Sequence, residues 1–230
     1  MATITPSTAI TLVRRNLDEA GLNESLMYTA ENNDNLSLDD IIRKTLPEAI
    51  NAVHLAAPVT SLEGSLYGFS SWARPEGEAV AVYPDGVLEF SPSKESAFLR
   101  LVEFKAVDSA IVLTDALEEA SAEGRKQLNP HIRGRYDRPR LVREQGRQSP
   151  PRFRYYTLRS ETLDDIDAAR DAISRFSFVS EQRYSPSATE YTVSALLRQN
   201  VIDQLTAMVL AIYGDQARQQ YFQTRASAFA

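Results

Sequence analysis

The sequence predicts an α+β fold in which helices at the two ends of the chain flank a central β region. Three observations lead to this prediction. Apolar residues near both termini recur every three or four positions, which is the period of an amphipathic helix. In residues 78–158 the period changes to two, which is typical of strands. Strands and helices do not alternate, so we expect the terminal helices to form a bundle beside a smaller antiparallel β region.

Two helices are predicted within residues 1–58. The first extends from Thr5 to Gly21, where Thr-Pro suits a helix N-terminus and glycine suits its end. The second extends from Ser37 to Pro58 and carries two aspartates in its first turn. Pro47 removes one backbone amide from this helix, so we expect it to kink or split there.

The central β region contains a predicted hairpin around the turn Pro84-Asp85-Gly86. Alternating or β-branched runs predict the hairpin strands and the strands that follow them, namely Ala79–Tyr83, Val87–Phe90, Ala97–Val107, Arg140–Val142 and Arg152–Leu158. For the first half of Ala97–Val107 a helix is the alternative. A short helix is expected within Asp115–Leu128.

The C-terminal part begins with a long helix predicted over residues 187–213, which Gly214 ends. Residues 214–230 form a polar tail that carries Tyr221, Phe222 and Phe229. Two interpretations of this tail remain open: it folds back on its own domain, or it is a docking peptide that becomes ordered on a partner. The whole chain, residues 1–230, is predicted to form a single domain.

The composition excludes several kinds of chemistry. The 230 residues include no cysteine, which removes disulfides, thiolate nucleophiles and thiolate metal sites. The only histidines are His54 and His131, and no phosphate-binding glycine loop occurs. We therefore predict that the protein is not an enzyme and has no catalytic residues, metal or cofactor. No signal peptide or membrane-spanning stretch is recognised, so we expect a protein made in the cytoplasm without a membrane anchor.

Three pairs of acidic residues could bind a metal ion or act in acid-base chemistry: Asp39-Asp40, Glu118-Glu119 and Asp164-Asp165. Carboxylates in the first turn or on the polar face of a helix are stabilised by the helix dipole or by water. We expect each pair to have such a structural role.

Positive charge is concentrated in residues 125–154. This basic arm contains ten arginines or lysines against Asp137 and Glu144, a net charge of +8, whereas the remaining residues sum to −14 and the whole chain to −6. Because proline and glycine interrupt it, we expect an extended arm or long loop. Two functions are open: the arginines bind phosphates of a nucleic acid, with Tyr136 stacking on a base, or they pair with carboxylates of a neighbouring subunit. We favour the second.

Four parts of the chain resemble the neck proteins of short-tailed bacteriophages, and more narrowly the ring or adaptor proteins of crAss-like phages. They are LPEAINAVHLAAP at Leu46–Pro58, FLRLVEFK at Phe98–Lys105, RGRYDRPRLV at Arg133–Val142 and the long C-terminal helix. The resemblance covers most of the chain in order, and its motifs are structural in character.

The resemblance implies a structural virion protein, a head-to-tail connector subunit of the virion neck. Such a subunit forms a ring, with twelve copies expected, that docks beneath the portal protein, supports further tail and neck ring proteins, and extends the channel for passing DNA without sequence-specific contact. We expect Arg133, Arg135, Arg138 and Arg140 to contact the neighbouring subunit. Tyr221, Phe222 and Phe229 are the candidates for docking onto the portal or the next ring.

Overall fold

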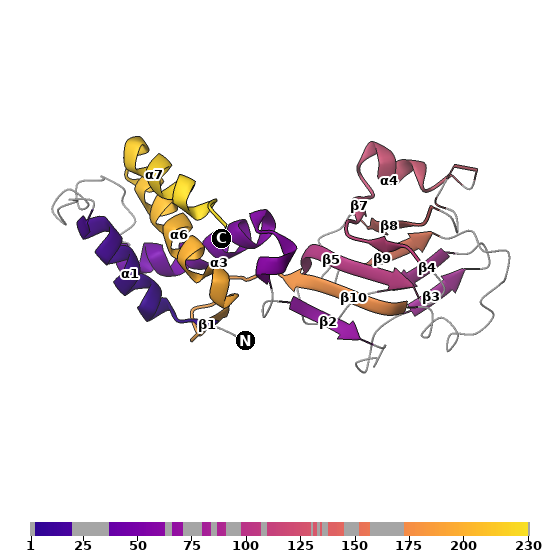
Figure 1. The fold of residues 1–230 in the computed structure, drawn as a ribbon, viewed down its shortest axis with the longest axis horizontal. Coiled ribbons are helices and arrows are strands. Elements are labelled where there is room, and N and C mark those ends of the chain that lie inside the picture. The colour runs from indigo at the N-terminus through magenta and orange to yellow at the C-terminus, as the bar shows by residue number, and fades with distance from the viewer. Residues whose placement is uncertain are drawn as a thin grey trace. The chain divides into compact units, whose positions relative to one another are not determined.

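The chain has an α+β fold and forms two compact units (Figure 1). The computed structural model describes residues 3–19, 37–62, 66–70, 80–83, 87–90, 98–106, 110–129, 131–132, 134, 138–144, 152–156 and 173–229. Met1–Ser65 and Gln182–Ala230 form the helical unit, and Leu66–Glu181 form the β unit. The chain therefore does not form the single domain that was predicted. The β unit is inserted between the two parts of the helical unit and has a core of its own. The two units are of nearly equal length, so the β region is not the smaller part.

The helical unit is built from both ends of the chain. Helix α1 packs against α3 and α6, α3 packs against α6, and α6 packs against α7. A two-stranded sheet pairs β1 with β11, opposing Ile4 to Tyr191. The elements are β1 (Thr3–Ile4), α1 (Pro6–Glu19), α3 (Leu38–Ala56), the 3-10 turns η1 (Val59–Leu62) and η2 (Ala195–Leu197), β11 (Tyr191–Thr192), α6 (Arg198–Ile212) and α7 (Gln216–Ala226).

Helix α3 confirms the helix predicted from Ser37 to Pro58. The Ser37 hydroxyl accepts a hydrogen bond from the backbone N–H of Asp40 and so caps the first turn. Pro47 is buried inside the helix, which continues without a break through 19 residues. Apolar residues on both sides of Pro47, including Leu46 and Ile50, are fully buried. Their burial against α1 and α6 outweighs the loss of one backbone hydrogen bond.

Helix α6 begins at Arg198, eleven residues after the start predicted for the helix over 187–213. Within the predicted range, Tyr191 and Thr192 form β11, and Val193 is buried beyond it. Pairing with β1 satisfies the backbone hydrogen bonds of this segment and buries Tyr191, so it does not join the helix. The C-terminal prediction is confirmed, because Gly214 has a φ of 78° and ends the helix.

The β unit contains two sheets, with strand orders β2-β10-β5-β6 and β3-β4-β9-β8-β7. All neighbouring strands are antiparallel except β7 and β8, which are parallel and so depart from the prediction. The elements are β2 (Leu66–Ser70), β3 (Val80–Tyr83), β4 (Val87–Phe90), β5 (Phe98–Ala106), β6 (Val112–Leu113), β7 (Leu117–Glu118), α4 (Ala122–Lys126), β8 (Arg140–Arg143), β9 (Phe153–Tyr156) and β10 (Ile173–Ser180).

An aromatic core joins the two sheets. Phe104 on β5 and Phe176 on β10 belong to one sheet, and Phe153 and Tyr155 on β9 belong to the other. The ring centroids of Phe153 and Phe176 lie 5.5 Å apart in an edge-to-face arrangement, which aromatic quadrupoles favour. The predicted hairpin is confirmed by the pairing of β3 with β4, while its turn, residues 84–86, lies outside the described residues.

Candidate functional site

The basic arm, residues 125–154, is not one long loop. It begins at the end of α4, includes all of β8 and enters β9. Leu141 on β8 and Phe153 on β9 are buried in the aromatic core. Full burial of one such side chain contributes about 1.5–3 kcal/mol, which an extended arm in water does not gain. The residues of the basic arm that lie in β8 and β9 therefore belong to the five-stranded sheet and not to the extended arm or loop that was predicted.

Two arginines of the basic arm form ion pairs inside the β unit. The Arg143 guanidinium lies 3.5 Å from the Glu118 carboxylate, which parallel pairing of β7 with β8 places opposite it. The Arg154 guanidinium pairs with Glu144 and lies 3.8 Å from the Glu119 carboxylate. These arginines satisfy carboxylates of their own unit, so they contribute less positive charge to a partner.

The four arginines predicted to contact a neighbouring subunit fall into two groups. Arg138 and Arg140 are exposed, and neither forms an ion pair with another residue in the described part of the chain. Arg140 begins β8 and lies opposite Tyr156 of β9, so its backbone position is held by the sheet. Arg133 and Arg135 lie outside the described residues. The structure thus leaves two of the four candidates accessible in a defined place.

The C-terminal tail folds back on its own unit as helix α7. Phe222 is buried between α7 and the rest of the helical unit, so the docking role expected of it is replaced by a core role. Tyr221, the adjacent residue, is 58% exposed, and Phe229 is partly exposed after the helix ends. Of the three aromatic candidates, Tyr221 is the one whose side chain is largely accessible.

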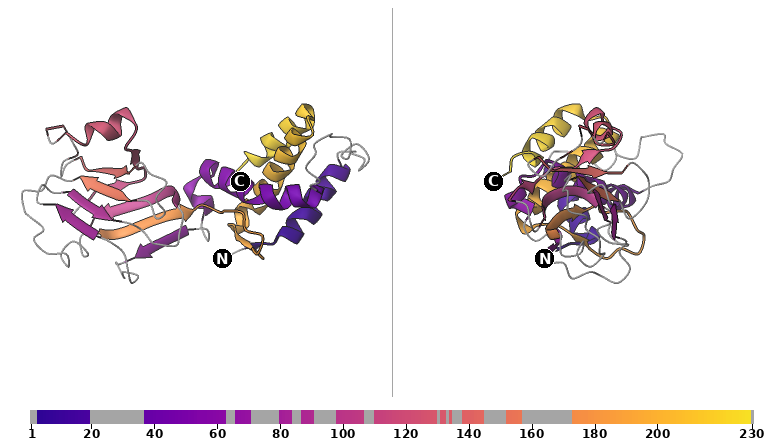
Figure 2. Two further views of the ribbon diagram at one scale, coloured as in Figure 1. Left: turned by 180° about the vertical axis from the view of Figure 1, so that it is seen from behind. Right: turned by 90° about the vertical axis from the view of Figure 1, so that its right-hand side faces the viewer.

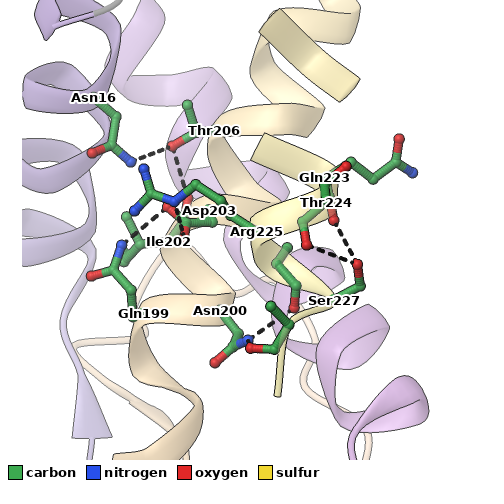
Figure 3. A network of polar contacts seen from close by, with 12 residues as sticks. Asn16, Gln199, Asn200, Ile202, Asp203, Thr206, Gln223, Thr224, Arg225 and Ser227 are labelled. Atoms are coloured by element: carbon green, nitrogen blue, oxygen red, sulfur yellow. Dashed lines mark hydrogen bonds and ion pairs between the residues drawn. The ribbon is translucent and has the colours of Figure 1, made fainter. Parts of the chain in front are cut away.

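A network of buried polar groups runs along α6, which the sequence analysis did not anticipate (Figure 3). Asn200, Asp203 and Thr206 are all buried, and their spacing of three residues places them on successive turns of the helix. The Thr206 hydroxyl donates to the backbone oxygen of Ile202 at 2.8 Å and accepts from the Asn16 amide of α1 at 3.1 Å. This end of the network joins α6 to α1.

The other end of the network joins α6 to α7. The Asn200 amide donates to the backbone oxygens of Ala226 and Ala228, at 3.0 and 3.1 Å. Asp203 lies one turn after Asn200 on α6, and its carboxylate is 3.3 Å from the Arg225 guanidinium of α7 (Figure 3). The network therefore satisfies the carbonyls at the end of α7 and pairs a buried charge.

Asp203 is the acidic side chain of this network, and it is buried. Burial raises its pKa, while the Arg225 charge and a 3.0 Å hydrogen bond from the Gln199 amide act in the opposite direction. The sequence signal available was that Asn200, Asp203 and Thr206 recur at every third position among the apolar residues of α6. It does not identify the partners, because those come from α1 and α7.

The two histidines belong to different units, His54 to the helical unit and His131 to the β unit. His54 lies in the last turn of α3 and is 1% exposed. Burial lowers its pKa to about 4, so the imidazole is neutral at pH 7. His131 is exposed in the β unit. His54 is thus part of the packed interior at the end of α3.

The acidic pairs occupy different structural positions. Asp39 and Asp40 lie in the first turn of α3 as predicted, and the Asp39 carboxylate is 3.0 Å from Arg14 of α1. Glu118 and Glu119 were expected on a helix, but Glu118 lies in β7 and Glu119 in the turn after it. Strand pairing brings Arg143 and Arg154 close to them. Asp164 and Asp165 lie outside the described residues.

No protein-family model and no curated protein matches the chain. Within the described ranges, none of the helices is both long enough and apolar enough to cross a bilayer.

Proposed function

We propose that this chain is a structural subunit of the head-to-tail connector of a short-tailed, crAss-like bacteriophage. About twelve copies form a ring beneath the portal protein, and the ring extends the DNA channel and supports further neck and tail proteins. The four terminal helices act as the bundle of each subunit, and the β unit carries the contact to the next one. The basis of the family assignment is the ordered resemblance of the four sequence segments.

The exposed pair Arg138 and Arg140 carries the assembly part of this proposal. Neither forms an ion pair with another described residue, and β8 holds the backbone of Arg140, two residues after Arg138, against β9. The remainder of the sequence is strongly acidic. In a ring, one face of each subunit contacts a different face of the next subunit. A basic face on one copy can therefore bind an acidic face on its neighbour.

The nucleic-acid alternative draws on the same arm, and the ion pairs of the β unit weigh against it. Arg143 and Arg154 already pair with carboxylates, which reduces the charge that phosphates would neutralise. The acidic net charge of −6 further opposes association with a polyanion.

The experiment compares wild type with the double variant Arg138→Glu/Arg140→Glu. Native mass spectrometry counts the copies in the assembly, and electron microscopy scores rings on portal-containing particles. The variant Arg43→Glu/Lys44→Glu is the matched control, because it makes the same change in charge at two exposed positions of α3. We expect rings from wild type and the control, and folded monomers from Arg138→Glu/Arg140→Glu.

Ring assembly that is unchanged by Arg138→Glu/Arg140→Glu would contradict the proposal. A wild-type chain that stays monomeric, but binds short DNA with an affinity that falls steeply as salt is added, would support the nucleic-acid alternative instead.

A further inference from the structure

The short helix α4 and the residues that follow it form a braced projection on the β unit. Both views place α4 on the side of the five-stranded sheet away from β2 and β10 (Figure 1, Figure 2). We use the name α4 loop for the described residues 127–129, 131–132 and 134. Gln127 and Gly134 lie at its two ends.

The two ends of the α4 loop are held together by a buried side chain. Gln127 is 5% exposed, and its Oε1 accepts a hydrogen bond of 2.7 Å from the backbone N–H of Gly134. Its Nε2 donates to the backbone oxygen of Glu123 at 3.2 Å. The Gln127 side chain therefore closes the base of the loop.

Close backbone contacts fix this base to the sheet. A Cβ on Gly134 would lie 2.9 Å from both the backbone nitrogen of Arg140 and the backbone oxygen of Tyr156. A Cβ on Gly124 of α4 would lie 2.0 Å from the backbone oxygen of Glu118. Only glycine permits this approach, so α4 and its loop are seated directly on β7, β8 and β9.

The α4 loop presents two large aliphatic side chains to solvent. Leu128 is 54% exposed and Ile132 is 58% exposed. Exposed apolar side chains on a braced loop lose little conformational freedom when a partner covers them, which favours binding. The exposed cations Arg125, Arg138 and Arg140 belong to the same segment of chain.

We propose that the α4 loop is an intersubunit docking element, with Leu128 and Ile132 as its apolar anchors and a second copy of this chain as the occupant. The inference deepens the proposed function and rests on it. The occupant follows from charge, because the exposed cations Arg125, Arg138 and Arg140 belong to the same segment of chain as the anchors, while the sequence outside residues 125–154 carries a net −14. An acidic surface of the next subunit therefore complements the rim, and its apolar atoms cover the anchors.

Photocrosslinking tests which surface a second copy covers. The chain has no cysteine, so Ile132→Cys provides a single attachment point for a benzophenone maleimide. The control is Leu196→Cys, at an aliphatic side chain of the helical unit that is 67% exposed. We expect crosslinked dimers between isotopically distinct copies from Cys at 132, with yields at least about fivefold above those from 196. Equal yields at the two positions, or crosslinks from 132 to an added DNA 30-mer only, would overturn the inference.

A second measurement uses Leu128→Ser/Ile132→Ser, whose circular dichroism should match wild type because both side chains are exposed. Loss of the two anchors should weaken self-association, measured by sedimentation, by at least about tenfold. Normal rings from this variant, together with monomers from Arg138→Glu/Arg140→Glu, would refute the docking role and leave the proposed function standing. A wild type that is monomeric both alone and with portal particles would refute both.

Discussion

The side-chain amide of Asn51 forms two hydrogen bonds with the backbone of Gln182. Its Nδ2 donates to the Gln182 carbonyl oxygen and its Oδ1 accepts from the Gln182 N–H, both at 2.8 Å. Asn51 lies on α3, and Gln182 is the first residue of the helical unit after the inserted β unit. The pair, 131 positions apart in sequence, joins the two separate segments that make up the helical unit.

Asn51→Ala should lower the free energy of unfolding of the helical unit by about 1–2 kcal/mol, because both backbone groups of Gln182 lose their partner. Asn51→Asp should cost at least as much at pH 7, since a carboxylate keeps the N–H partner but faces the carbonyl oxygen. Urea unfolding followed by circular dichroism at 222 nm measures both. Gln220→Ala, at an exposed position of α7, is the control. If the Asn51 variants lose no more unfolding free energy than Gln220→Ala does, the role assigned to Asn51 is contradicted.

His54 should make the helical unit less stable in acid. Its folded-state pKa is about 4 and its ordinary value 6.5, so the unfolded chain binds the proton more readily between these values. Stability is therefore complete above about pH 6.5 and falls as the pH is lowered toward 4, by up to about 3 kcal/mol. Urea unfolding at pH 7.5, 6 and 5 measures the slope.

The control for this pH dependence is a pair of variants. His54→Leu should flatten the dependence between pH 4 and 6.5, while His131→Gln, at an exposed position, should leave it unchanged. A slope that persists in His54→Leu would assign the effect to other groups.

Arg225→Met should destabilise the helical unit by about 1–2 kcal/mol at pH 7, because it leaves the buried Asp203 carboxylate with the Gln199 hydrogen bond alone. Burial already raises the pKa of Asp203, and loss of Arg225 raises it further. A raised folded-state pKa means that the penalty disappears as the carboxyl becomes protonated. The loss should therefore be smaller at pH 4 than at pH 7 when measured by chemical unfolding.

Adding Asp203→Asn to Arg225→Met should recover part of the loss at pH 7, since the neutral amide needs no counter-charge. A double variant that is no more stable than Arg225→Met would show that packing of the Arg225 side chain, and not the charge of Asp203, explains the effect.

Gly124→Ala should destabilise the β unit by about 1–3 kcal/mol, because the added methyl group would lie 2.0 Å from the Glu118 oxygen. Alanine in place of glycine inside an unhindered helix normally stabilises by about 1 kcal/mol, so the sign of the effect is diagnostic. Thermal unfolding measures it. A rise in melting temperature would exclude the close seating of α4 on β7.

Gly214→Ala provides the contrasting case. Nothing lies within 4 Å of the added Cβ, but the φ of 78° remains unfavourable for alanine. The expected cost, about 1 kcal/mol, arises from the backbone alone and falls on the helical unit.

The residues of α3 and β5 illustrate what local sequence could predict. Ser37 and the apolar spacing through Val53 define α3, because both the cap and the buried face come from one continuous segment. The alternation of apolar and polar residues from Val102 to Ala106 similarly indicates β5. Prediction failed at Tyr191, because its strand exists only by pairing with Ile4 at the other end of the chain.

The same distinction explains the candidate site. The excess of arginine in residues 125–154 and the exposed-looking aromatics of the tail could be read directly from the sequence. Whether an arginine is available depended on its neighbours in space: strand pairing placed Glu118 beside Arg143 and left Arg140 exposed. Likewise, α7 buried Phe222 and exposed Tyr221, adjacent residues with the same aromatic character.

By itself, the sequence determined the α+β class, the principal helices and strands and the concentration of charge, since these depend on propensity and spacing along one segment. Tertiary structure decided the division into two units, the partners of Asp203 and the bracing of the α4 loop. Each of these depends on groups distant in sequence, whose contact free energies exist only once the chain has folded.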